Sequence, residues 1–234
     1  MKQIASPSAP PRRTRGIAIA GLAVVVLAGL AYVVRRPLGM AAPSCLAGHW
    51  HGCYDTENGV VLMTLLGLPL AALVAGALAY RRRAAGAASA WRKSVAEVGM
   101  VYGTVPLVWM TMQPGPGAGV VPGRVSLVPL RDLVTMGPLG IGGNLLILAA
   151  LGVFAPMRFA ALASVPRILA LGAGSSILIE LAQYVLRLDR VSSVDDVLVN
   201  ATGAVLAGLV SRRWWSAAAP VSSDRPRPEP VAAR

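Results

Sequence analysis

Residues 179–208 read IELAQYVLRLDRVSSVDDVLVNATGAVLAG, and this stretch decides the class of the fold. It places a cluster of ionisable and amide side chains inside and between two strongly apolar segments. A charged side chain at the centre of a bilayer costs about 2.5–3.5 kcal/mol on insertion scales, so such groups are rarely kept without a partner or a task. The stretch therefore predicts a polytopic membrane protein that carries a polar cluster.

The composition of the 234-residue chain agrees with this interpretation. Hydrophobic residues make up 55% of the chain and charged residues 14%, whereas a soluble domain carries about 25% charged residues. The net charge of +12 could suggest nucleic-acid binding. However, the arginines lie in the gaps between apolar segments, as the flanks of membrane spans do. The sequence has no basic patch with interleaved aromatic residues, so we expect no nucleic-acid partner.

Apolar segments of about 20 residues are long enough to cross the hydrocarbon core as helices. We therefore expect an all-α, polytopic transmembrane bundle of about six spans. The rival interpretation of the first span, 17–34, is a cleaved signal peptide. Its long apolar run and the following Arg35 and Arg36 favour an uncleaved span. The six expected spans cover residues 17–34, 60–80, 95–112, 141–157, 167–187 and 195–211.

The polar segments complete the expected organisation. Residues 113–140 are rich in Gly and Pro and are predicted to form a long loop, with a re-entrant end as one interpretation. Most of the 22 basic residues lie on one side of the membrane if both termini are cytoplasmic, which the positive-inside rule favours. Arg35 and Arg36 are a local exception. The predicted parts are a basic cytoplasmic N-terminus at 1–16, two spans within 17–95, a membrane domain at 96–212 and a disordered cytoplasmic tail at 213–234.

Two cysteines and two histidines lie in the loop after the first span, as Cys45, His49, His51 and Cys53. Their spacing is not one of the standard zinc patterns. The expected topology places this loop on the oxidising outer side, where thiols tend to pair. We therefore predict a disulfide between Cys45 and Cys53 and no metal site. A metal bound in this loop and two unpaired thiols are the alternatives.

In the fifth and sixth spans, polar residues recur every three or four positions and therefore share one face of each helix. The short link at 188–194 makes the two helices antiparallel neighbours, so both polar faces can meet inside the bundle. The cluster would then line a cavity open to the outer leaflet, or Arg190 would pair with Asp195 and Asp196. The two faces consist of Ser176, Glu180, Gln183 and Arg187 in the fifth span and Asp196, Asn200 and Gly203 in the sixth.

Asn144 is expected at a comparable depth in the fourth span, and Ala204 and Gly208 offer a small-residue contact for close helix packing. Buried polar groups in membranes often only hold helices together, at about 0.6 kcal/mol each. Their density here favours a ligand or catalytic site. Any hydrolysis would depend on carboxylates, because no histidine lies outside the cysteine loop. The candidate ligand-binding residues are Asn144, Glu180, Gln183, Arg190, Asp195, Asp196 and Asn200, and no catalytic residue is assigned.

Several of these motifs resemble the VanZ-like family of bacterial membrane proteins, over roughly residues 98–210. The family pattern E-x-x-Q, R-x-x-D-x-x-D and N-x-x-G-x-x-x-G resembles the stretch from Glu180 to Gly208. Upstream, Asn144-Leu-Leu-Ile-Leu resembles N-x-x-L-F, and Ser126-Leu-Val-Pro129-Leu130 resembles N-L-x-P-F. The chain departs from the pattern at Ser126, at Ala149-Ala150-Leu151-Gly152 in place of F-x-P-L-G, and at Ser193 in place of Asp.

The resemblance implies a multi-pass protein of the bacterial cytoplasmic membrane with a role in the cell envelope, and it implies no reaction and no cofactor. The family takes its name from a member linked to low-level teicoplanin resistance. We therefore expect membrane lipids as partners, and as ligand a lipid-linked cell-wall precursor or a glycopeptide-related molecule. The alternatives are an intramembrane, carboxylate-dependent enzyme that acts on lipid-linked substrates, and a structural or transport subunit whose polar cluster only packs helices.

Overall fold

The structure, a computed structural model, describes residues 51–215 and scattered residues between 21 and 47. The expected N-terminus at 1–16, most of the first span and residues 216–234 of the expected tail lie outside the described residues. The chain divides into two units, Met1–Gly67 and Leu68–Arg234. Each unit is described by itself below.

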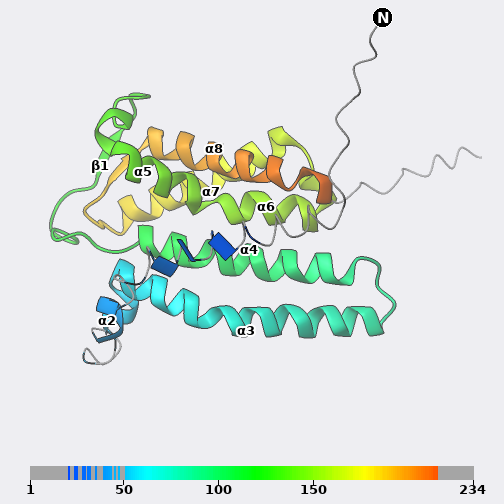
Figure 1. Ribbon diagram of the computed structural model, residues 1–234. Coiled ribbons are helices and arrows are strands. Elements are labelled where there is room, and N and C mark those ends of the chain that lie inside the picture. Colours follow the sequence, from blue (N-terminus) through cyan, green and yellow to red (C-terminus); the bar gives the residue numbers. More distant parts are fainter. Residues whose placement is uncertain are drawn as a thin grey trace, which may run out of the picture. The chain divides into compact units, whose positions relative to one another are not determined.

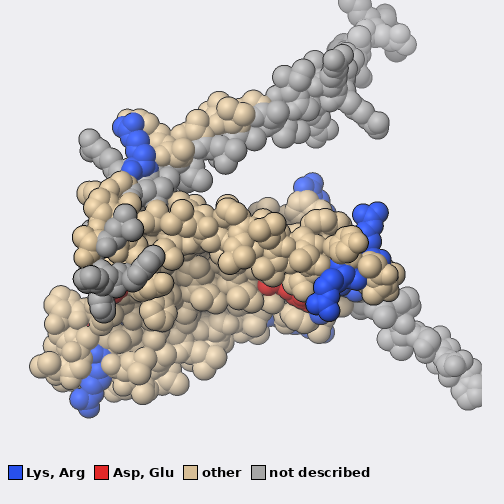
Figure 2. All heavy atoms as spheres, turned by 90° about the horizontal axis from the view of Figure 1, so that it is seen from below, with Lys and Arg blue, Asp and Glu red and all other residues tan. Residues whose placement is uncertain are grey.

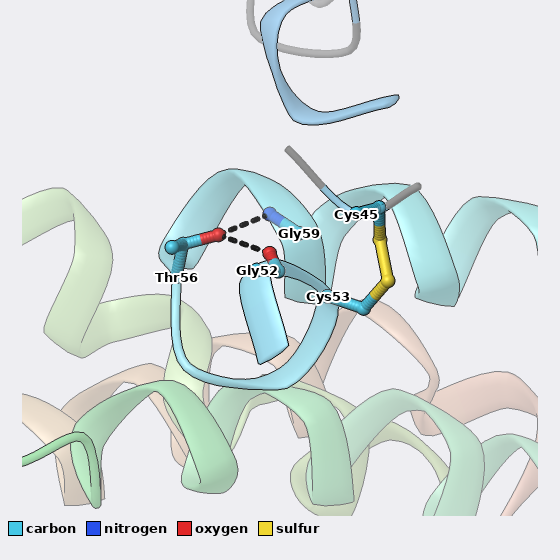
Figure 3. Close-up of a disulfide and its surroundings, with 5 residues drawn as sticks. All are labelled: Cys45, Gly52, Cys53, Thr56 and Gly59. Carbon is cyan, nitrogen blue, oxygen red and sulfur yellow. Dashed lines mark hydrogen bonds between the residues drawn. A yellow bond between two sulfur atoms is a disulfide. The ribbon is translucent and has the colours of Figure 1, made fainter. Parts of the chain in front are cut away.

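The first unit contains α2 (His51–Tyr54) and the beginning of α3 (Glu57–Ala84). Thr56 caps α3, since its Oγ1 accepts a hydrogen bond from the N–H of Gly59 at 3.0 Å and donates one to the carbonyl of Gly52 at 2.6 Å (Figure 3). A disulfide joins Cys45 to Cys53, whose Cα atoms lie 4.7 Å apart (Figure 3). Both thiols of the loop are therefore used in this bond, while His49 lies outside the described residues.

The second unit is helical apart from one short pair of strands, so the predicted helical class is confirmed. Among the described residues, three stretches are long and apolar enough to cross a membrane, namely Glu57–Ala84, Leu133–Arg158 and Val165–Val185. The count of six spans and the cytoplasmic termini stay predictions. The remaining elements are α4 (Ala90–Thr111), β1 (Arg124–Ser126), α5 (Leu133–Ile147), α6 (Ala149–Arg158), η1 (Ala160–Leu162), α7 (Val165–Val185), β2 (Val191–Ser193), α8 (Val194–Val210) and η2 (Arg212–Trp214).

Helix α8 packs against α5, α6 and α7, while α6 also packs against α4 (Figure 1). Two glycines allow this close approach. A Cβ atom on Gly203 would lie 2.0 Å from the carbonyl oxygen of Leu145, and one on Gly152 would lie 2.0 Å from that of Ala204. The backbones of α8, α5 and α6 therefore touch directly, which is the small-residue packing expected of membrane helices.

The helices of the second unit, including the part of α3 after Gly67, carry large apolar side chains on their outer faces. Leu139 is 92% exposed, Leu73 70% and Val210 77%. One face of the molecule shows mainly uncharged residues, with Lys and Arg atoms gathered toward the ends (Figure 2). Apolar surface on this scale is costly in water but suits the hydrocarbon of a bilayer. Together with the three apolar helices, it identifies a membrane protein.

At one end of the second unit, two arginines form ion pairs with Glu97 of α4. Arg82, near the end of α3, donates to the Oε2 of Glu97 and, at 2.9 Å, to the Oγ of Ser94. Arg158, the last residue of α6, donates to the other oxygen of Glu97. The cluster ties α3, α4 and α6 together at the basic end of the unit. The polar residues of α7 and α8 lie at the opposite end, where α4 finishes at Thr111.

The Gly- and Pro-rich segment 113–132 folds over the link between α7 and α8. The N–H of Gly115 donates to the carbonyl of Leu188, and that of Gly119 to the carbonyl of Arg187, each at 2.9 Å. Strand β1 pairs in parallel with β2, with Val125 opposite Ser192. The segment is thus a loop, as predicted, but one that is docked on the link by backbone hydrogen bonds.

Two boundaries differ from the expected ones. Helix α5 begins at Leu133 rather than near 141, and its first turn is separated from the rest by Gly137, whose φ is +68°. The C-terminal tail, expected from residue 213, begins with folded residues. The ring nitrogen of Trp215 donates to the carbonyl of Gly208 at 3.1 Å, so the end of the chain that the structure describes turns back onto α8.

Candidate functional site

Helix α7 ends at Val185, two residues earlier than the polar spacing predicts. The N–H of Arg187 donates to the carbonyl of Tyr184, and the N–H of Leu188 to that of Gln183, each at 3.1 Å. Arg187 itself has a φ of +51°. These two bonds and the left-handed residue form a Schellman motif, which closes a helix. Arg187 is therefore exposed and lies outside the helix, and the prediction that it continues the polar face of Gln183 is wrong.

The other polar residues of α7 are buried against α8 and α4. Ser176 is fully buried, and its Oγ accepts a hydrogen bond from the Nδ2 of Asn200 at 2.8 Å. The Nε2 of Gln183 donates to the carbonyl of Thr111 at 2.9 Å. The polar faces of α7 and α8 therefore meet inside the bundle, as the spacing of their residues predicts.

Two carboxylates reach this interior from neighbouring helices. The Oε2 of Glu180 accepts the backbone N–H of Ser193 at 3.1 Å, and the backbone carbonyl of Glu180 accepts the hydroxyl of Ser192 at 2.9 Å. The Oδ1 of Asp196 accepts the Nδ2 of Asn144 at 2.5 Å. Asn144 comes from α5, so three helices contribute polar groups at the same depth.

These groups surround a polar cavity of about 340 Å³. Six of the seven predicted ligand-binding residues line this polar cavity, whereas Asp195 does not. The six are Asn144, Glu180, Gln183, Arg190, Asp196 and Asn200.

The list of candidate residues from the sequence left out three further polar residues that line the polar cavity, Thr111, Arg124 and Asp189. Arg124 and Asp189 form an ion pair with 3.2 Å between nitrogen and oxygen. Asp189 also accepts the N–H of Gly117 at 3.0 Å, so the pair anchors the docked loop at the cavity. Arg124 begins the three-residue strand β1 and Asp189 lies in the link after α7, and neither segment has a periodicity that marks a shared face. Their opposite charges were the only signal in the sequence.

Arg190 is directed at the same loop. Its Nε donates to the carbonyl of Gln113 at 3.3 Å. The predicted ion pairs of Arg190 with Asp195 and Asp196 are absent among the described residues. The reason is that the guanidinium is held at the cavity wall by the loop backbone, while Asp195 is engaged elsewhere.

Asp195 organises the start of α5 and is only 1% exposed. Its carboxylate accepts three backbone N–H groups, from Leu130 at 2.6 Å, Asp132 at 2.8 Å and Leu133 at 3.1 Å. Ser193 caps α8, since its Oγ accepts the N–H of Asp195 at 3.1 Å. Ser193 also donates to Asp132 at 2.7 Å. Asp195 thus ties two helix starts together and is not part of the polar cavity.

The hydrogen bonds that Asp132 receives have an electrostatic consequence. The hydroxyls of Ser126 and Ser193, of which Ser193 donates to its carboxylate, hold the pKa of Asp132 below its ordinary value. Asp132 lies in the loop before α5, so this charge stabilises the junction of loop and helix.

A second, apolar groove of about 480 Å³ adjoins the polar cavity, and Glu180 lines both. The groove lies beside β1, α7 and α8. Its apolar side chains include Val125, Leu127, Ile177 and Leu181. Among the described residues, no group of three or more His, Cys, Asp or Glu side chains is placed to hold a metal ion.

The residues of the polar cavity fall within a region that matches a known protein family. The family model described as VanZ/LLP1 matches residues 99–215, a range that contains every residue lining the polar cavity. No curated protein and no solved structure matches the chain. The resemblance over residues 98–210 is therefore confirmed and extends to the folded tryptophans after α8. This membrane protein belongs to the VanZ/LLP1 family of VanZ-like proteins.

Proposed function

We propose that this protein binds the headgroup of a membrane lipid or of a lipid-linked cell-envelope molecule in its polar cavity, and that binding alters sensitivity to glycopeptides such as teicoplanin. The observation that carries the proposal is the cavity itself. A space of about 340 Å³ lined by carboxylates, amides and guanidinium groups lies within a bundle of apolar helices. Burial of so many polar groups is unfavourable unless they bind one another or a ligand.

The lining suits a headgroup in several respects. Arg190 and Arg124 can attract a phosphate or carboxylate, because guanidinium groups bind such anions through charge-assisted hydrogen bonds. The amides of Asn144 and Gln183 can donate to or accept from hydroxyl groups. The apolar groove on the other side of Glu180 offers a surface for the hydrocarbon part of an amphipathic molecule.

The proposed location is the bacterial cytoplasmic (plasma) membrane, with the polar cavity facing the outer leaflet. Arginines are concentrated at the other end of the second unit, at 81–83 and at 212–213. The positive-inside rule favours a cytoplasmic position for that end. The envelope precursors that glycopeptides recognise are exposed on the outer side, which is where this orientation puts the cavity.

The proposal is tested by drug susceptibility in a strain that lacks the protein. The strain is complemented with the wild type, Glu180→Gln, Asp196→Asn or the control Glu57→Gln at matched membrane abundance. Glu57 is an exposed carboxylate in the first turn of α3. We expect the wild type and the control to restore teicoplanin resistance and the two cavity variants to fail, with vancomycin measured alongside. Equal behaviour of all four proteins would mean that the polar cluster only packs helices.

A further inference from the structure

The polar cavity carries one more negative than positive formal charge. Its lining contains the carboxylates of Glu180, Asp189 and Asp196 and the guanidinium groups of Arg124 and Arg190. Arg124 and Asp189 neutralise each other in their ion pair. Arg190 is left to balance both Glu180 and Asp196, with which it interacts electrostatically. A buried carboxylate without a counter-charge is strongly unfavourable, so the cavity is one cation short.

A second observation is independent of charge. Asn200 is 1% exposed and lines the polar cavity, and its Oδ1 is buried without any hydrogen-bond partner. Its Nδ2 is already used by Ser176. An unpaired buried carbonyl oxygen loses its hydration without compensation. A hydrogen-bond donor on a ligand in the cavity would therefore satisfy the Oδ1 of Asn200.

The carboxylates add acceptors of the same kind. Ser193 uses the Oε2 of Glu180 and Asn144 uses the Oδ1 of Asp196, which leaves Oε1 and Oδ2 as further acceptors. A primary ammonium group has one positive charge and three N–H donors, and no acceptor. It therefore matches both the missing charge and the set of unused acceptors.

We infer that the polar cavity recognises a primary ammonium group, held by Glu180, Asp196 and Asn200, on a ligand whose anionic phosphate or carboxylate lies at Arg190. The ligand class is thus a zwitterion with an amine, such as an aminophospholipid headgroup. The inference rests on the proposed function, since it names the kind of headgroup that the cavity binds. The same chemistry occurs in free phosphoethanolamine, so both sources are included in the test.

The test uses the purified full-length protein in detergent. Binding of phosphatidylethanolamine is compared with binding of its N-acetyl derivative, which keeps the acyl chains and the phosphate but lacks the positive charge of the ammonium group. Binding of free phosphoethanolamine is measured as well. Bound lipid is measured by native mass spectrometry and by thermal stabilisation. We expect the wild type to bind the amine lipid about tenfold or more tightly than the acetylated one, since hydrogen bonds to charged groups are worth at least this much. Glu180→Gln combined with Asp196→Asn should abolish this preference, and Glu57→Gln should keep it.

The outcomes separate the inference from the proposed function. Equal binding of the amine lipid and its acetylated form overturns the inference and leaves lipid binding intact, with a proton shared by Glu180 and Asp196 as the source of neutrality. Failure to bind either lipid overturns the proposed function too. Tight binding of phosphoethanolamine alone supports ammonium recognition but contradicts a lipid as its source. The comparison of two lipids on the wild type decides the question even if the double variant does not fold.

Discussion

At the scale of single residues, Asp195 and Asp196 are neighbours in the chain with different surroundings. Asp196 lines the polar cavity and accepts Asn144, whereas Asp195 is enclosed by three backbone N–H groups. Successive residues of a helix point in different directions, about 100° apart, so adjacent carboxylates can serve different sites. Asp196 therefore belongs to the proposed binding site, whereas Asp195 has a structural role.

Asp195→Asn should destabilise the protein. The amide would place an N–H₂ group against backbone donors, and the charge that strengthens the three hydrogen bonds would be lost. We expect a loss of about 2 kcal/mol or more in the free energy of unfolding. The unfolding temperature in detergent measures it, with Glu57→Gln as the control. An unfolding temperature unchanged from that of the wild type would contradict the structural role of Asp195.

Arg187→Gly should stabilise the protein. Arg187 occupies the left-handed position of the Schellman motif, with a φ of +51°, and its side chain is exposed. A side chain in this conformation costs about 1 kcal/mol, which glycine avoids. We expect a higher unfolding temperature for Arg187→Gly. Arg187→Ala keeps the Cβ atom and should show no gain, so equal gains in both variants would rule out backbone strain as the cause.

Residue spacing identified much of the site, for a physical reason. Glu180, Gln183 and Asn200 lie on regular helices, where a separation of three or four positions fixes a shared face. Arg124 begins β1 and Asp189 lies in the link after α7, and only the paired backbones of the docked segment bring them together. Residue spacing alone therefore identifies the cavity residues that lie on helices and misses those on β1 and on the link after α7.

At the scale of elements, helix existence is predicted well and helix ends are predicted poorly. The apolar segments correspond to α3, α4, α7 and α8 to within a few residues. The end of α7 was misjudged because arginine stands where glycine usually closes a helix. The early start of α5 was missed because Gly137 and Pro138 look like loop residues, yet they only interrupt the helix. The pairing of β1 with β2 has no local signal, since each strand has three residues.

Gly203→Ala and Gly152→Ala should both disrupt the packing of α8. Each new methyl group would lie 2.0 Å from a backbone carbonyl oxygen of a neighbouring helix, so the helices must separate. We expect a loss of about 1–3 kcal/mol, typical of overpacked interiors. Gly174→Ala is the matched control, because nothing lies within 4 Å of its added Cβ. Unfolding temperatures of the three variants in detergent give the comparison, and tolerance of alanine at residue 203 would refute the close contact.

At the scale of the whole molecule, the orientation in the membrane is the main prediction. Ala87 lies in the exposed turn between α3 and α4, and Val120 is 85% exposed in the docked loop. We expect a membrane-impermeant maleimide to label Val120→Cys in intact cells and Ala87→Cys only after permeabilisation, with the wild type as the blank. Labelling of Ala87→Cys in intact cells would reverse the topology and place the polar cavity on the cytoplasmic side.

The long sequence separations within the polar cavity bear on how the protein is made. Asn144 and its partner Asp196 are 52 residues apart, and Thr111 and Gln183 are 72 residues apart. Synthesis proceeds from the N-terminus, so α4 and α5 leave the ribosome well before the groups that complete their polar contacts. The cavity can therefore close only once the α7–α8 hairpin has entered the bilayer. A nascent chain halted before that hairpin would expose unpaired amides to lipid and present a recognisable substrate for membrane quality control.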